Sequence, residues 1–292
     1  MILSPVTLTL WPSALAVLAY GLASVLPDRT APAEVAAESP NHPPAPERAT
    51  WALLAFGWLA HAVSIVFDTF NWDSPQPAAR FGFAPALSVT SWLVLTVYAL
   101  ESRRLGLSPI TRRILALLAA ATVTLAWSFP GQEHPTSDSP WAPLHWILGF
   151  ASYGLIGAAL MHAALMRHAE RQLRARPGSP KGISLGGSHP SGAPLLRLES
   201  LTLRFVAAGF AMLTLTLLLG AWFAHPWRWD HKSVFSVLSW LVFAILLIGR
   251  RQFGWRGRQA VRWLYAGSAL LLLAYVGSRF VMEVVLHRPV IS

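Results

Sequence analysis

The nine residues 225–233, "HPWRWDHKS", have an unusual composition for a connection between two long apolar runs. Such connections are usually built from Gly, Asn, Ser and Pro, which suit turn geometry. Here Trp227 and Trp229 stand among two histidines, an aspartate and two cations. In an extended segment, residues two apart face the same way, so both indoles can form one apolar shelf rimmed by Asp230 and Lys232. The segment is suited to hold a flat molecule, although single interfacial tryptophans are also routine membrane anchors.

His145 provides a second group with chemical potential, in the first turn of an apolar run that begins "APLHWILGFASYG". Gly149 at i+4 and Ser152 at i+7 share its helix face. Small residues below a histidine allow either close approach of another helix or a flat ligand standing against the backbone. Both alternatives stay open.

Two further histidines lie inside apolar runs. His61, followed by Ser64 and Asp68, lies roughly 10 Å from the Asp68 end of its run at 1.5 Å per residue. An ionisable side chain at that depth is costly and marks a candidate buried or transit ligand. The alternative is a neutral histidine hydrogen-bonded to a neighbouring helix. His162 lies near the end of its own run, where we expect it to snorkel toward the interface.

These residue types match the needs of a porphyrin, which are axial imidazoles, apolar contact for the ring and positive charge for the propionates. Zinc would also use histidines, but the sequence has no His-x-x-x-His and no carboxylate at metal-site spacing beside them. We therefore predict non-covalent haem b, with iron between His145 and His225. His225 precedes Pro226, which marks a helix end. The ligand would therefore belong to the tryptophan segment itself, residues 225–233. His287, the competing second ligand, lies near the C-terminus, where a chain frays more easily.

The composition shows what must position these groups. Of the 292 residues, 54% are apolar and 12% are charged, and the mean hydropathy is +0.47. Soluble domains carry about 25% charged residues, so lipid must solvate most of this chain. The 14 tryptophans fit the aromatic enrichment of membrane interfaces. Because the chain contains no cysteine, it has no disulfide, no thiolate metal site and no thiol relay of its own.

Crossing about 30 Å of hydrocarbon takes roughly 20 apolar residues in a helix. Eight segments qualify, so we predict an all-α polytopic membrane helix bundle, organised as a single integral membrane domain over residues 1–292. The first segment has no Lys or Arg before its apolar run, so we expect a retained span there and no cleaved signal peptide. The predicted spans are 3–26, 50–68, 85–101, 111–129, 142–166, 202–223, 233–249 and 259–286.

The basic residues predict the orientation, because cytoplasmic connections carry an excess of Lys and Arg. The connections 27–49, 101–113, 167–204 and 249–262 hold 18 of the 23 Lys and Arg residues. This side is therefore expected to be cytoplasmic, with both termini and the tryptophan segment outside. The net charge of +10 is accounted for by this bias, and no nucleic-acid partner is needed to explain it. Segments 27–49 and 177–194 are rich in Pro, Ala, Gly, Ser and Glu and are expected to be disordered cytoplasmic linkers.

With these motifs assembled, the sequence resembles the cytochrome c assembly family, the CcsA/HemX-like haem-handling membrane proteins. The segment "WRWDHKSVFSVLSWLVFAILLIGRRQFGWRGRQAVRW" is similar to the family's tryptophan-rich signature, and "LAYVGSRFV" resembles its last span. The span "PLHWILGFASYGLIGAAL" resembles the one that carries the family's first external histidine. The core of the resemblance covers about 50–287, and the chain looks most like the eight-span, multi-pass members of the bacterial inner membrane.

The resemblance implies that haem is presented at the outer surface between external histidines. On that pattern Trp227, Trp229 and Asp230 match the signature, His145 matches the first ligand, and His287 lies close to where the second follows. His231, Ser233 and Phe235 depart from the usual proline, acid and tryptophan. Ile248 occupies the place of a histidine that the family's full haem synthases use for a membrane-embedded haem. The chain therefore lacks one residue of that second site.

The leading hypothesis is a haem-binding factor of c-type cytochrome biogenesis, acting at the periplasmic face. It would not be an enzyme alone but a component of a haem–apocytochrome c ligation system, because reductant and thiols must come from apocytochrome c and other membrane assembly factors. A second hypothesis is a HemX-like membrane regulator of tetrapyrrole synthesis, acting through the Arg-rich 167–204 connection. A third is a structural or transport protein without a cofactor, whose histidines only pack or pair.

Overall fold

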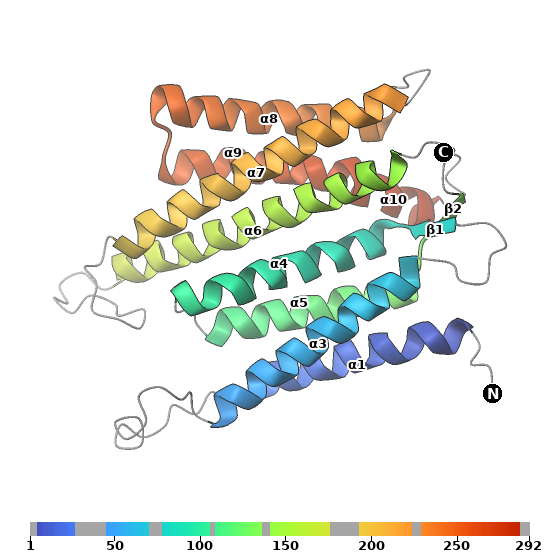
Figure 1. Ribbon diagram of the computed structural model, residues 1–292. Coiled ribbons are helices and arrows are strands. Elements are labelled where there is room, and N and C mark those ends of the chain that lie inside the picture. The colour runs from blue at the N-terminus through green and yellow to red at the C-terminus, as the bar shows by residue number, and fades with distance from the viewer. Residues whose placement is uncertain are drawn as a thin grey trace. The chain divides into compact units, whose positions relative to one another are not determined.

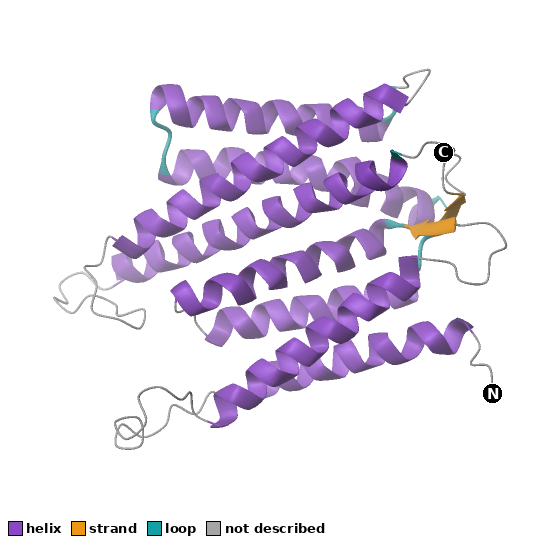
Figure 2. Ribbon diagram, viewed as in Figure 1, coloured by secondary structure: helices purple, strands orange, loops and turns teal. Residues whose placement is uncertain are grey.

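The computed structural model describes residues 5–26, 45–69, 78–105, 109–135, 141–175, 193–223 and 229–286. Helices make up nearly all of these residues, as Figures 1 and 2 show. Seven of the described helices are long and apolar enough to cross a membrane, and the first helix contains a shorter apolar stretch, Leu10–Val25. The predicted all-α polytopic membrane bundle is confirmed.

Prolines mark where several of these helices begin. A proline in the first turn costs no hydrogen bond, because the first amides of a helix have no partner within the helix. Beyond these positions the apolar runs continue with Leu, Ala and Val, and most backbone groups can bond within their own helix, as lipid requires; Pro12, inside α1, is an exception because it has no N–H to donate. First-turn prolines occur at Pro5, Pro46, Pro85, Pro109, Pro143 and Pro194.

The chain divides into two compact units, residues 1–95 with 107–133, and residues 96–106 with 134–292. In the first unit, α1 (Pro5–Val25) packs against α3 (Ala45–Thr69) and α5 (Pro109–Ser128), and α4 (Phe83–Leu105) begins there. A short sheet pairs β1 (Ala78–Phe81) with β2 (Gln132–Pro135), which the sequence did not predict.

The second unit contains the paired helices α6 (Ala142–Ala175) and α7 (Ala193–Phe223), which lie side by side in Figure 1. It also contains α8 (His231–Phe253), which packs against α7 and α9 (Gly257–Leu272). The last span continues through a π-helical stretch (Leu273–Gly277), α10 (Ser278–Phe280) and a second π-helical stretch (Val281–Val285).

Several helices are longer than the sequence predicted. Helix α6 continues to Ala175 and α7 begins at Ala193, so much of the Arg-rich 167–204 connection is helical. Residues 45–49 and 193–194, at the edges of the two predicted linkers, belong to α3 and α7. The remainder of both linkers lies outside the described residues. The hydrophobic criterion locates the part of a helix in lipid, whereas polar turns can extend the helix beyond it.

Candidate functional site

His145 lies in the first turn of α6 and packs onto the last turns of α7. A Cβ atom on Gly220 would lie 3.0 Å from Cε1 and 3.5 Å from Nδ1 of His145, so the imidazole fills the space that a glycine leaves. The same side chain interacts with the backbone of Thr216, one turn earlier in α7. Metal-ligating histidines commonly have their second ring nitrogen held by such a backbone group. Helix α7 therefore holds the orientation of this candidate ligand.

Two cations from different helices converge on the ring of Tyr275. Nζ of Lys232, in α8, lies 5.8 Å from the ring centroid, and Cζ of Arg279, in α10, lies 5.7 Å from it. Lys232 is also within electrostatic range of His145. His145, Lys232, Tyr275 and Arg279 are called the outer cluster below, after the side of the membrane on which the sequence predicts them. It combines one imidazole with two positive charges beside an aromatic ring.

The backbone of the last span is irregular where it contributes to the outer cluster. Tyr275 lies in the first π-helical stretch, and Arg279 lies between the two stretches. A π-helical turn adds a residue and re-aims the side chains that follow it, and such turns are frequent at functional sites. The hydroxyl of Tyr153, in α6, donates a hydrogen bond to the carbonyl of Leu271, one turn before Tyr275. This bond ties the irregular segment to the helix that carries His145.

The tryptophan segment is described only from Trp229 onward. Trp229 is 69% exposed. Asp230 caps α8, because its Oδ1 accepts the backbone N–H of Ser233 at 2.7 Å. An Asp immediately before an apolar run is a helix N-terminus signal, so the capping role of Asp230 could have been predicted from the sequence. His225, Trp227 and His287 lie outside the described residues, and their roles stay predictions.

The small residues below His145 serve helix packing. Ser152 is fully buried, and its Oγ donates to the carbonyl of Gly149 at 2.7 Å. A Cβ on Gly149 would lie 3.8 Å from Cγ2 of Thr216, an ordinary contact distance. Helix α7 thus covers this face of α6. Of the two alternatives left open by the sequence, close approach of another helix accounts for these residues.

His61 lies in the first unit and is fully buried. Its Nδ1 is 3.3 Å from the hydroxyl of Tyr20, and its Nε2 is 2.8 Å from Oγ of Ser88. The ring of Tyr20 also lies over Gly57, one turn before His61, where a Cβ would approach the ring carbons to 3.0 Å. Both ring nitrogens are therefore engaged by neighbouring helices. Iron ligation by His61 would require at least one of these bonds to break.

A second polar chain lies one turn further along α3. Oγ of Ser64 is 2.8 Å from Oγ of Ser13, in α1, and donates to Oδ2 of Asp68 at 3.0 Å. These bonds satisfy hydroxyl groups that lipid could not. The polar residues that mark α3 in the sequence thus join α1, α3 and α4 inside the first unit.

The expectation that His162 snorkels toward the interface is wrong. The side chain is fully buried, its Nδ1 donates to the carbonyl of Ala158 at 2.8 Å, and its ring centroid lies 5.1 Å from that of Phe205. Because α6 extends well past the predicted span, His162 lies inside the bundle, where α7 covers it. It lies more than four helical turns from His145, at 3.6 residues per turn.

Sequence reasoning missed Gly220 and Tyr275 as parts of the site. A glycine near the outer end of an apolar run is common in membrane helices, so Gly220 carries no distinctive signal. Tyr275 stands four residues before Arg279, a spacing that places both on one face of a regular helix. Among the described residues, no three His, Cys, Asp or Glu side chains converge as a metal cluster would.

The comparisons with known proteins cover most of the chain. A family model described as "Cytochrome C assembly protein" matches residues 48–286. The Escherichia coli (strain K12) "Inner membrane protein YpjD" is 29% identical over 234 residues, which span 78% of this chain and 84% of that protein. No solved structure matches the chain.

Two cyanobacterial proteins named "Cytochrome c biogenesis protein CcsA" are also similar. The one from Prochlorococcus marinus (strain MIT 9303) is 29% identical over 225 residues, 66% of this chain and 70% of that protein. The one from Synechococcus sp. (strain WH7803) is 29% identical over 171 residues, 49% of this chain and 53% of that protein.

The hydrogen bonds of His61 predict a stability effect. Ser88→Ala leaves Nε2 of His61 buried without its partner, which should cost about 1–3 kcal/mol and lower the thermal unfolding midpoint in detergent micelles. Ser128→Ala is the matched control, because Ser128 is exposed and bonds only to the carbonyl of Thr124 in its own helix. Equal midpoints for the two variants would show that the His61 bonds do not stabilise the first unit.

Proposed function

Since the chain belongs to the cytochrome C assembly protein family, we propose that it binds haem at the outer face of the membrane, between external histidines. The protein is a multi-pass inner-membrane protein with a role in cytochrome c biogenesis. The observation that carries the haem proposal is the orientation of His145 on Gly220, beside the two cations at Tyr275.

The chemistry of the outer cluster fits haem. A backbone contact and the packing on Gly220 fix the orientation of the imidazole ring, as an axial ligand requires. Lys232 and Arg279 supply charge-assisted hydrogen-bond donors for carboxylates such as the propionates. When bound, haem would supply an iron whose reduction potential depends on its axial ligands. This chain would ligate the iron, orient the porphyrin and hold the propionates.

The tryptophan segment completes the proposed site. Trp227 and Trp229 would contact the porphyrin plane. Asp230 caps α8 and so stabilises the first turn of the helix, in which Lys232 lies. Apocytochrome c and other membrane assembly factors would supply the thiols and reductant, because this chain has no cysteine. In this role haem b is held non-covalently until it is transferred.

A second candidate function is regulation of tetrapyrrole synthesis or another partner without haem delivery. Ile248, which stands where the family's synthases use a histidine, is 57% exposed, so this position does not face the interior of the described bundle. Deletion of the gene separates the two candidates, because only a delivery factor is required for holocytochrome c.

The haem proposal predicts that one histidine of α6 matters and another does not. His145→Ala should lower the haem retained on purification, or bound on addition, about tenfold or more, since an axial ligand is lost. His162→Ala should retain haem, because His162 lies far along the same helix. Absorption spectra at equal protein concentration measure the bound fraction, with thermal midpoints confirming that both variants are folded. Equal retention in the two variants would refute the site.

The second axial ligand is proposed to be His225, with His287 as its competitor. A ligand on a short turn tied to the tryptophan segment loses less entropy on binding than one close to a chain end. His225→Ala should therefore remove the low-spin bis-imidazole spectrum, and His287→Ala should leave it intact. The opposite pattern would assign the ligand to His287.

A further inference from the structure

The first π-helical stretch of the last span, Leu273–Gly277, has backbone bonds that differ from those of an α-helix. In a regular helix the N–H of Tyr275 donates to the carbonyl of Leu271, four residues earlier. Here the hydroxyl of Tyr153, in α6, donates to that carbonyl and also bonds with the backbone of Tyr275. Because a hydroxyl has one proton, its oxygen must accept from the Tyr275 N–H. Tyr153 is therefore inserted between two backbone groups that normally pair.

A second hydroxyl satisfies a carbonyl that the π turn leaves without its α-helical partner. The N–H of Ser278 bonds to the carbonyl of Leu273, five residues earlier. In a regular helix this N–H would donate to the carbonyl of Ala274. Oγ of Ser278 takes that role and donates to the Ala274 carbonyl at 2.9 Å. Two side chains thus complete the π turn, and one of them, Tyr153, comes from another helix.

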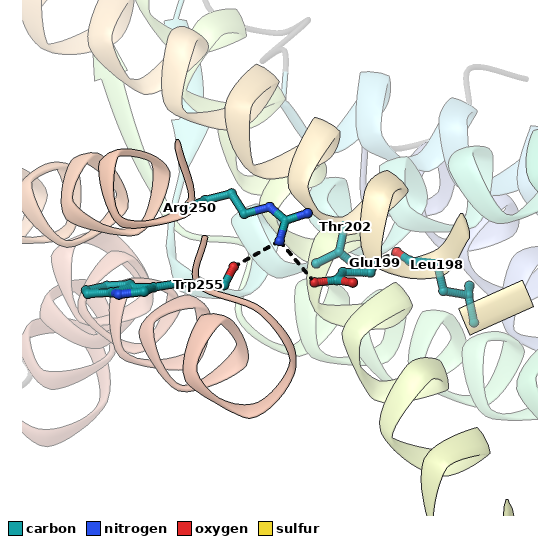
Figure 3. A network of polar contacts seen from close by, with 5 residues as sticks. All are labelled: Leu198, Glu199, Thr202, Arg250 and Trp255. Atoms are coloured by element: carbon teal, nitrogen blue, oxygen red, sulfur yellow. Dashed lines mark hydrogen bonds and ion pairs between the residues drawn. The ribbon is translucent and has the colours of Figure 1, made fainter. Parts of the chain in front are cut away.

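The start of the last span is anchored to its neighbours. At the turn before α9, Nη1 of Arg250 donates to the carbonyl of Trp255 at 3.1 Å and forms an ion pair with Oε1 of Glu199, in α7, at 3.5 Å, as Figure 3 shows. Further along α9, Oγ of Ser239, in α8, donates to the carbonyl of Gly267 at 2.9 Å. A change in the π turn would therefore move the end of the span that follows the turn, because α9 is held in place.

The π turn sets the rotational position of Arg279. Such a turn adds one residue to the helix, so its loss would rotate the residues that follow by one position, about 100°. Arg279 would then take the place now held by Phe280, whose side chain is 43% exposed. With the turn present, Cζ of Arg279 lies 5.7 Å from the ring centroid of Tyr275, and Nζ of Lys232 lies 5.8 Å from the same centroid. The two cations therefore meet at this ring only while the π turn persists.

We propose that Tyr153 is a positioning residue of the outer cluster. Its hydroxyl keeps the carbonyl of Leu271 and the N–H of Tyr275 apart and so stabilises the π turn. The turn in turn holds Arg279 beside the cation of Lys232. Without the hydroxyl, the two backbone groups would bond to each other, since lipid offers them no other partner, and the last span would become a regular α-helix. The effect on helix register does not involve haem, whereas the effect on the propionates rests on the proposed function.

A distance between two spin labels tests the register of the full chain in detergent without haem. The chain has no cysteine, so Leu238→Cys in α8 and Val285→Cys near the end of the span, both exposed, can be labelled selectively. Pulsed electron paramagnetic resonance should show a shifted distance when Tyr153→Phe is added. Deletion of Val276 from that variant removes the extra residue of the π turn, so the native distance should return. Tyr265→Phe, at an exposed position of α9, is the matched control and should leave the distance unchanged.

Haem titration of the same chains, without the spin labels, measures the consequence for the site. Tyr153→Phe should weaken haem binding about tenfold, which corresponds to one hydrogen bond to a charged group. Deletion of Val276 from this variant should restore the affinity, which a loss caused by misfolding would not allow. Haem dimethyl ester, whose propionates are blocked, should bind the unaltered chain and the Tyr153→Phe variant equally.

Four results would each overturn the proposal. They are an unchanged distance in Tyr153→Phe, a shifted distance that the deletion of Val276 does not correct, a register shift that leaves haem affinity unchanged, and an equal loss of affinity for haem and its dimethyl ester. If the unaltered chain binds no haem, the proposed function fails, and the spin-label distances alone decide whether Tyr153 sets the register.

Discussion

The close packing of α6 against α7 is the constraint on which the second unit depends. Lipid tails are as apolar as leucine, so membrane helices associate through close backbone approach and interhelical hydrogen bonds. Ser152 is fully buried on the face of α6 that α7 covers, and Gly220 leaves the space that the imidazole of His145 fills. The packing that holds the two helices together also aims the candidate ligand.

Histidines inside this membrane protein are used in two ways. His61 in the first unit is satisfied by two hydroxyl groups, and His162 is buried with its Nδ1 bonded to its own helix, so both serve packing in the described structure. His145 instead lies at a helix end, beside Lys232 and near the aromatic ring that Lys232 and Arg279 share. A position at the end of the spans where an imidazole lies within electrostatic range of a cation is suited to contact a ligand.

The sequence predicted the helices well, because runs of about 20 apolar residues have few alternatives in lipid. The sequence did not predict the features that depend on contacts between helices. His162 was expected at an interface because the polar turns that extend α6 carry no hydrophobic signal. His145 and Asp230 were singled out by residue type and position, but the space at Gly220 and the π-helical turn that places Tyr275 depend on helix pairing and backbone irregularity. Neither helix pairing nor backbone irregularity can be predicted from the hydrophobic periodicity of a single sequence.

The most direct test of the central claim, that α7 aims His145 at haem iron, compares two glycine-to-alanine variants. A methyl group at position 220 would lie 3.0 Å from Cε1 of His145 and must shift the ring, whereas at position 149 it would meet only Cγ2 of Thr216, at 3.8 Å. Both changes raise helix propensity equally. Haem titration followed by absorption should show about tenfold weaker binding, or more, for Gly220→Ala and near-normal binding for Gly149→Ala. Haem binding that is equally strong in both variants would contradict the account.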